Sequence, residues 1–184
     1  MAVLVSYATA HGSTREIAEA VARQLSQQLA PIPVDCIPAA ATPLLSSPEG
    51  NKYKAVVIGS AIHVGRWIAP GRRFLKQNEP YLSSGNPDVP RVWAFSVGMP
   101  PTDDDLAKEE VSMDKWLRER LRLQGHRLFR GAFDKADLPW IIRLIFACCV
   151  PEDKTRFGDS RDWPAIRAWA DGVGTRIKEE AVPS

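Results

Sequence analysis

The sequence predicts a doubly wound α/β domain with a five-stranded parallel sheet in the strand order 2-1-3-4-5, and two observations carry this prediction. Short apolar runs recur along the chain, as expected for strands that are buried on both faces. Segments with apolar residues at helical spacing alternate with these runs, which is the pattern of successive βαβ units. Because parallel crossovers are right-handed, few strand orders remain, and we expect this one.

The individual elements follow from local patterns and from the residues that begin each segment. The first predicted helix carries one apolar stripe at every fourth residue, formed by Ile17, Val21, Leu25 and Leu29. Negative charge is favourable at a helix N-terminus, so Asp103–Asp105 begin one helix, and Asp162 caps the last. We expect strands at residues 2–7, 34–37, 55–59, 92–97 and 128–133. We expect helices at residues 14–29, 68–78, 103–123 and from 162 onward.

The composition is that of one globular domain, which we expect to span residues 1–184. Lys and Arg number 24 against 22 Asp and Glu, and this near balance gives no reason to expect a nucleic-acid partner. The first strand follows no basic segment, and no run reaches the roughly 20 apolar residues of a membrane span. Three cysteines without a Cys-x-x-Cys pair favour free thiols, and we expect a cytoplasmic protein with no metal site.

The residues after the first strand are suited to bind a phosphate. They open a helix, whose N-terminus offers unpaired backbone N–H groups and the positive end of the helix dipole. Gly12 allows a tight turn, and hydroxyl groups nearby add donors. The alternative is a helix cap without a ligand. The Gly-x-x-x-x-Gly-Lys-Ser/Thr and Gly-x-Gly-x-x-Gly patterns are absent. The expected phosphate contacts are Thr9, Ala10, His11, Gly12, Ser13 and Thr14.

Two further strand ends carry candidate ligand-binding loops, because ligands of parallel sheets lie at the carboxyl ends of the strands. After the third strand we expect a flat apolar wall with accessible backbone N–H groups, formed by Ala61, Ile62, His63, Val64, Gly65 and Trp67. The alternative for Trp67 is an anchor between the next helix and the sheet. After the fourth strand, glycine and proline fix a loop that can approach the edge of a ring, at Ser96, Val97, Gly98, Met99 and Pro100. The alternative is an ordinary strand-to-helix turn.

Together these loops resemble the flavodoxin superfamily. Residues 9–14 are similar to its phosphate loop, Thr/Ser-x-Thr-Gly-x-Thr, except that His11 replaces the usual middle Thr or Ser. The likeness is closer to the menaquinone-dependent protoporphyrinogen dehydrogenase branch, and it is carried by segments 59–67, 95–99, 130–133 and 158–163. The resemblance implies FMN as cofactor, with its phosphate on residues 9–14 and its ring between residues 60–67 and 96–101.

The resemblance also implies a function: an FMN-dependent oxidoreductase that passes reducing equivalents between an organic substrate and a quinone-like acceptor. His63 and Arg66 are the polar side chains that we expect nearest the substrate, as catalytic candidates. His126 precedes the fifth predicted strand, so we expect it at the opposite end of the sheet. One alternative is an electron carrier of the flavodoxin type, which docks onto partner enzymes and has no substrate of its own. Another is a flavodoxin fold that has lost FMN and serves in interactions.

An insertion near the fifth strand, between Asp134 and Asp159, contains the most apolar run of the chain, Leu138–Val150. The run is shorter than the roughly 20 residues that cross a bilayer. Packing in the core or a dimer contact is one interpretation. The other is a surface helix that meets a lipophilic quinone, a membrane interface or a partner protein. A peripheral membrane position and an oligomer are both compatible with this segment.

Overall fold

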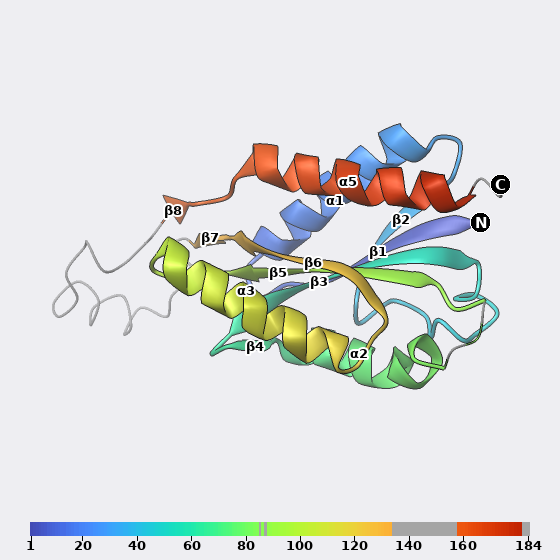
Figure 1. Ribbon diagram of the computed structural model, residues 1–184, viewed down its shortest axis with the longest axis horizontal. Helices are drawn as coiled ribbons and strands as arrows, with labels where there is room; N and C mark the ends of the chain where they lie inside the picture. Colours follow the sequence, from blue (N-terminus) through green and yellow to red (C-terminus); the bar gives the residue numbers. More distant parts are fainter. Residues whose placement is uncertain (85, 87, 134–157, 182–184) are drawn as a thin grey trace, which may run out of the picture.

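The computed structural model describes residues 1–84, 86, 88–133 and 158–181, and a parallel β-sheet lies at its centre between two layers of helices (Figure 1). A short strand, β4 (Arg66–Trp67), pairs antiparallel with the end of β3. The parallel strands lie in the order β2 (Val34–Pro38), β1 (Ala2–Ala8), β3 (Tyr53–His63), β5 (Arg91–Gly98) and β6 (Leu123–Arg130). Counted along the chain without β4, this order is 2-1-3-4-5, so the predicted fold class and strand order are confirmed.

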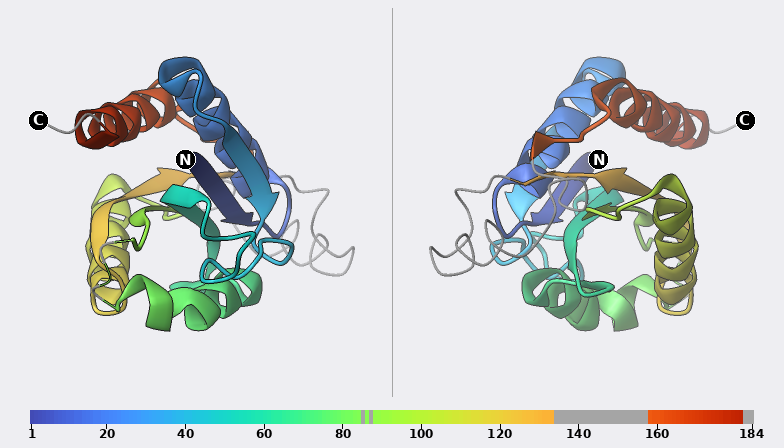
Figure 2. Two further views of the ribbon diagram at one scale, coloured as in Figure 1. Left: turned by 90° about the vertical axis from the view of Figure 1, so that its right-hand side faces the viewer. Right: turned by 90° about the vertical axis from the view of Figure 1, so that its left-hand side faces the viewer.

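Helices cover both faces of the sheet, as the end-on views in Figure 2 show. Side chains of each strand alternate between the two faces, so that Val3 and Val5 join one core and Leu4 joins the other. Because both faces are buried, β1 is apolar along most of its length. The first core contains α1 (Ser13–Leu29) and α5 (Trp163–Ala181), and the second contains α2 (Ala69–Leu82) and α3 (Asp103–Arg118).

A glycine in the middle of the sheet sets how closely β3 and β5 pack. Gly59 lies opposite Phe95 in the parallel register. A Cβ atom on Gly59 would lie 2.1 Å from Cζ of Phe95, so only glycine leaves room for the aromatic ring. The two loops that follow these strands therefore start from a fixed relative position.

Several element boundaries differ from the sequence prediction. The sequence predicts a turn at 60–65, but β3 stays extended to His63 and the chain reverses only at Val64 and Gly65. The fifth parallel strand starts at Leu123 and ends at Arg130, not at 128 and 133. Its first half is polar because it lies at the sheet edge, and a polar run of this kind has the sequence pattern of a loop.

A two-stranded antiparallel ladder closes the base of the insertion. Its strands are β7 (Ala132–Phe133) and β8 (Gly158–Asp159), which bring residues 133 and 158 together. The apolar segment Leu138–Val150 lies outside the described residues. Within the ranges that the structure does describe, no helix is both long and apolar enough to cross a bilayer.

Candidate functional site

The loop between β1 and α1 presents backbone donors rather than a side-chain cap. Gly12 has a φ of 91°, and its N–H donates to Oγ1 of Thr9 at 3.0 Å. No side chain caps the N-terminus of α1, so the N–H groups of its first turn face the end of the helix. Uncapped donors and the positive end of the helix dipole suit an anion such as a phosphate.

Contacts from the far end of the chain hold this loop in place. The hydroxyl oxygen of Ser13 accepts a hydrogen bond from the N–H of Ala132 at 2.8 Å. The guanidinium of Arg161 donates to Glu16 in the first turn of α1 at 2.6 Å and to Asp159 at 2.7 Å. Of the predicted phosphate-loop residues, Ala10 and His11 are exposed, whereas Thr14 is only 1% exposed. The loop is therefore fixed by β7, β8 and α1 together.

The second predicted loop is the β3–β4 hairpin, and a non-glycine residue at its tip has an unfavourable backbone conformation. Val64 has a φ of 49° and Gly65 a φ of 66°. A β-branched residue rarely adopts positive φ, and such outliers concentrate at functional sites. The side chain of Val64 is also 85% exposed, which is unusual for valine. The hairpin therefore presents an apolar tip at the carboxyl edge of the sheet.

The two faces of the hairpin have different roles. Ile62 pairs with Trp67 and His63 pairs with Arg66 across it, so His63 and Arg66 lie on the face opposite Ile62. Both polar side chains are exposed, and neither lines the cavity described below. The structure thus places the two predicted catalytic candidates at the rim of the site, away from its interior.

Trp67 anchors the hairpin to the sheet, which is the alternative that the sequence left open. Its side chain is 1% exposed and presents no ring face to solvent. Its indole N–H donates to Oγ of Ser96 at 2.7 Å, and its ring packs edge-on against Trp116 of α3. The prediction that Trp67 forms part of an accessible apolar wall is wrong, because the ring is buried in the core.

A buried chain of polar side chains connects three strands beneath the loops. Oγ of Ser96 lies 2.9 Å from Nε2 of His126, so Trp67, Ser96 and His126 form one hydrogen-bonded series from β4 through β5 to β6. His126 lies inside β6 opposite Ala94, and the prediction that it lies at the far end of the sheet is wrong. Burial lowers the pKa of His126 from its usual range to about 4, so its ring is neutral at physiological pH.

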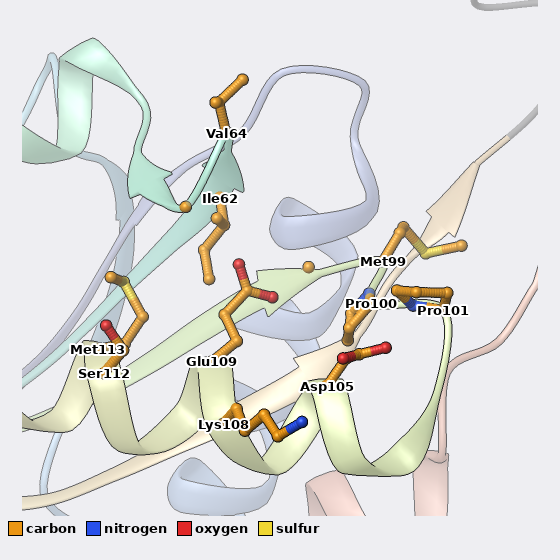
Figure 3. A pocket seen from close by; sticks show the side chains of 12 residues that line it. Ile62, Val64, Met99, Pro100, Pro101, Asp105, Lys108, Glu109, Ser112 and Met113 are labelled. Atoms are coloured by element: carbon orange, nitrogen blue, oxygen red, sulfur yellow. The ribbon is translucent and has the colours of Figure 1, made fainter.

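The hairpin and the loop after β5 form two walls of a cavity, and α3 forms the third (Figure 3). Its volume is about 560 Å³, within the range of small-molecule sites. Residues of the loop at 9–14 are not among those that line it. The lining residues are Ile62, Val64, Gly65, Gly98, Met99, Pro100, Pro101, Asp105, Lys108, Glu109, Ser112 and Met113.

The α3 wall contains functional candidates that the sequence analysis did not identify. Counted from Asp105, the residues Lys108, Glu109, Ser112 and Met113 stand at i+3, i+4, i+7 and i+8, which places all five on one face of the helix. This spacing was a usable signal, since a mostly polar stripe with a methionine is not the pattern of a core-facing helix. Asp103–Asp105 were expected only to begin a helix, and Thr102 does cap α3 by accepting from the N–H of Asp105.

Glu109 is the acidic side chain that projects furthest into the cavity in Figure 3, between the ends of β3 and β5. A Cβ atom on Gly98 would lie 3.2 Å from its Oε2, so the carboxyl group lies against the backbone of the predicted ring-edge loop. Burial raises the pKa of Glu109 above its usual range. Among the described residues, no group of three or more His, Cys, Asp or Glu side chains is arranged to hold a metal ion.

These features define a class of protein: an α/β domain with a helix N-terminus that no side chain caps and a largely apolar cavity, both at the carboxyl edge of its sheet. A family model described as the flavodoxin domain matches residues 4–157, and the chain belongs to this family. No curated protein sequence matches the chain.

Solved structures with the same fold cover nearly all of the chain at low sequence identity. A flavodoxin from the domain Archaea is 14% identical with a TM-score of 0.56, covering 97% of this chain and 99% of the other. Flavodoxin 2 from Bacillus cereus is 15% identical with a TM-score of 0.58, at 97% and 99% coverage. Rubredoxin oxygen:oxidoreductase from Desulfovibrio gigas is 14% identical with a TM-score of 0.60, and the match covers 98% of this chain but 37% of that protein.

FMN is the cofactor that the family indicates, and the donor set fits it. Uncapped N–H groups at the start of α1 suit the phosphate group. The apolar hairpin tip and the backbone around Gly98 suit the edge and face of a planar ring. When bound, FMN supplies the hydride or electron chemistry, while the protein supplies orientation and electrostatics.

Proposed function

We propose that this protein is an FMN-dependent oxidoreductase that passes reducing equivalents between an organic substrate and a quinone-like acceptor. In this proposal, residues 9–14 bind the phosphate of FMN, and the β3–β4 hairpin and residues 96–100 bind its ring. The resemblance of the sequence to the menaquinone-dependent protoporphyrinogen dehydrogenase branch supports the class of substrate that we propose: a planar, apolar, aromatic or quinonoid molecule.

The cavity beside α3 is the observation that supports an enzyme. An electron carrier needs only an exposed ring edge, whereas an enzyme also needs room for a second molecule next to the ring. The cavity has that room, apolar contacts from Ile62, Val64 and Met99, and polar groups from α3. Its polar groups include both a carboxyl and an amino group, on Glu109 and Lys108.

The carrier remains the second candidate because several of the structural neighbours are themselves named flavodoxins. The two functions make different demands on the α3 wall. A carrier transfers electrons through the ring edge and does not depend on the cavity volume. An oxidoreductase loses its acceptor site when the cavity is filled.

The test fills the cavity from α3 and measures oxidation of the reduced protein. Ser112→Trp places a large ring in the cavity wall, and Val111→Trp is the matched control, because Val111 is 70% exposed and does not line the cavity. Each protein is loaded with FMN, reduced anaerobically with dithionite, and mixed with menadione as a quinone probe or with ferricyanide. The proposal expects Ser112→Trp to slow oxidation by menadione about tenfold or more, with oxidation by ferricyanide unchanged.

Equal rates of menadione oxidation in both variants would favour the carrier. Absence of FMN binding in the unmodified chain would contradict both candidates. The number of stages in the dithionite titration gives an independent criterion, since a two-electron enzyme is expected to reduce in one stage and a carrier in two separate one-electron stages.

A further inference from the structure

We infer that Glu109 couples reduction inside the cavity to proton uptake, and that its own carboxylate receives the proton. The inference rests on the proposed function, since it takes the FMN ring to lie against the cavity walls that the hairpin and the loop after β5 form. It assigns a role in proton linkage to a residue of α3, a helix that carries none of the predicted cofactor contacts.

Glu109 lies on the face of α3 that lines the cavity. Its side chain leaves α3 and extends toward the space between Ile62 and the end of β5 (Figure 3). Its Oε2 lies 3.2 Å from the position of a Cβ atom on Gly98. Two of the three cavity walls, the hairpin and the loop after β5, thus face this carboxyl group. A charge that forms in the cavity is therefore close to it.

Among the described residues, Glu109 has no partner that would fix its charge. Within the part of the chain that the structure describes, its carboxylate forms no ion pair or hydrogen bond with another residue. The neighbouring Glu110 differs, because it accepts from the N–H of Leu128 at 3.3 Å and pairs with Arg127 at 3.6 Å. A carboxyl without partners responds to a change in local charge more strongly than one held by a cation.

The elements around the cavity carry other charged groups besides Glu109. The hairpin and the loop after β5 line it with apolar residues and glycines, and their exposed His63 and Arg66 face away from it. α3 contributes Asp105 and Lys108. β6, which packs against α3, contributes Arg130, which is paired with Asp103 at 2.7 Å, and the neutral ring of His126 behind Ser96. Glu109 is thus the titratable group of the lining with a pKa that burial shifts toward neutrality.

The proton linkage follows from electrostatics. Burial already raises the pKa of Glu109, and additional negative charge in the cavity raises it further. At a pH between the pKa of Glu109 in the oxidised complex and its higher pKa in the reduced complex, reduction therefore draws about one proton from solvent onto Glu109. The electrons come from dithionite, which is oxidised to sulfite, and would be accepted by the bound FMN. The proton assigned here comes from solvent, is additional to those that the cofactor takes up, and forms an O–H bond on a carboxylate oxygen of Glu109.

The experiment measures the midpoint potential of the FMN-loaded full chain from mildly acidic to mildly alkaline pH. Glu109→Gln keeps the shape of the side chain and removes the titration, and Glu109→Asp keeps a titratable carboxyl. Glu119→Gln is the matched control, since Glu119 is the C-cap residue of α3 and lies about 15 Å from Glu109 along the helix axis. Proton uptake on reduction is measured directly with an indicator dye in weakly buffered solution.

The inference expects a steeper pH dependence in the unmodified protein and in Glu119→Gln than in Glu109→Gln, by up to about one proton per two electrons. Glu109→Asp should keep a steep region at a different pH. Identical slopes and identical dye signals in the unmodified protein and Glu109→Gln, with FMN bound in both, would overturn the inference and leave the proposed function standing. Failure of the unmodified chain to bind FMN would overturn both.

Discussion

The loop after β1 and the cavity beside α3 lie at the same edge of the sheet, but they are built differently. The loop at residues 9–14 consists of neighbours in the sequence and offers mostly backbone N–H groups at a helix N-terminus. The cavity takes its walls from three elements that are far apart in the sequence, and it offers side chains. A buried hydrogen-bonded series, Trp67–Ser96–His126, holds two of those walls together.

The two regions therefore suit two different tasks of a cofactor site, which are to bind an anionic group and to respond to a change of charge. Backbone donors have a fixed dipole and do not titrate, so the N–H groups of the loop at 9–14 keep the same charge distribution at every pH. Side chains in the cavity do titrate, and their charges respond to what happens there. We therefore expect substitutions in the first region to change cofactor affinity, and substitutions in the second to change stability, pH dependence and chemistry.

The largest expected effect is the pH dependence of the free energy of unfolding that His126, beneath the cavity walls, causes. Burial lowers its pKa from an ordinary value near 6.5 to about 4, so the folded protein binds fewer protons than the unfolded chain between these values. The contribution of His126 to stability is fully present above about pH 6.5 and is lost as the pH falls through about 4. The loss is about 3 kcal/mol, measurable by urea unfolding at the two ends of this range.

His126→Gln separates this effect from the titration of carboxyl groups. The variant has no imidazole, so its free energy of unfolding should fall less than that of the unmodified protein over the same pH range. A loss of equal size in both proteins would mean that His126 is not the group responsible.

Ser96→Ala should break the connection between the two loop-bearing strands. It leaves the buried indole N–H of Trp67 and Nε2 of His126 without their partner, which should lower the free energy of unfolding by about 2 kcal/mol. FMN affinity should fall as well, because the hairpin and the loop after β5 are no longer tied. Urea unfolding and FMN fluorescence titration measure the two effects. Ser46→Ala, at an exposed position, should change the free energy of unfolding by less than about 0.5 kcal/mol.

Gly12→Ala should act on the first region alone. Gly12 has a φ of 91° with open space around it, so alanine meets no atom but adopts an unfavourable backbone conformation at a cost of about 1 kcal/mol. If the loop shifts to relieve this cost, FMN affinity falls roughly five- to tenfold. Gly172→Ala in α5 also has open space, and there binding should stay unchanged while stability rises by up to about 1 kcal/mol. Equal affinities in both variants would contradict an anion site at residues 9–14.

The smallest effect is expected at the hairpin tip, where stability and binding should change in opposite senses. Asn tolerates the φ of 49° at residue 64 better than Val does, so Val64→Asn should raise the free energy of unfolding by about 0.5 kcal/mol. FMN affinity should fall slightly, because an exposed apolar contact is lost. Val111→Asn, an exposed position on α3 outside the cavity, should leave affinity unchanged. A Val64→Asn protein that binds FMN as tightly as the unmodified chain would remove the hairpin tip from the site.

Much of the fold could be predicted because the signals are local. Apolar runs identified all five parallel strands, and Asp162 was correctly expected to cap α5, where it accepts from the N–H of Ala165 at 2.9 Å. The boundaries of β3 and β6 were less accurate. β3 continues into a hairpin that depends on the turn at Val64 and Gly65, and β6 is an edge strand whose polar residues have a loop-like pattern.

By itself, the sequence determined the order of the elements and the position of the loop at residues 9–14, because both depend on residues that are neighbours along the chain. The strand order could be predicted because right-handed crossovers leave few alternatives. Only the tertiary structure decided that Trp67 is an anchor, that the half-buried His126 contacts Ser96, and that the carboxyl group of Glu109 lies against Gly98. These contacts join residues from different strands and helices. Their distances depend on how the helices pack on the sheet, and periodicity within a single segment carries no information about that packing.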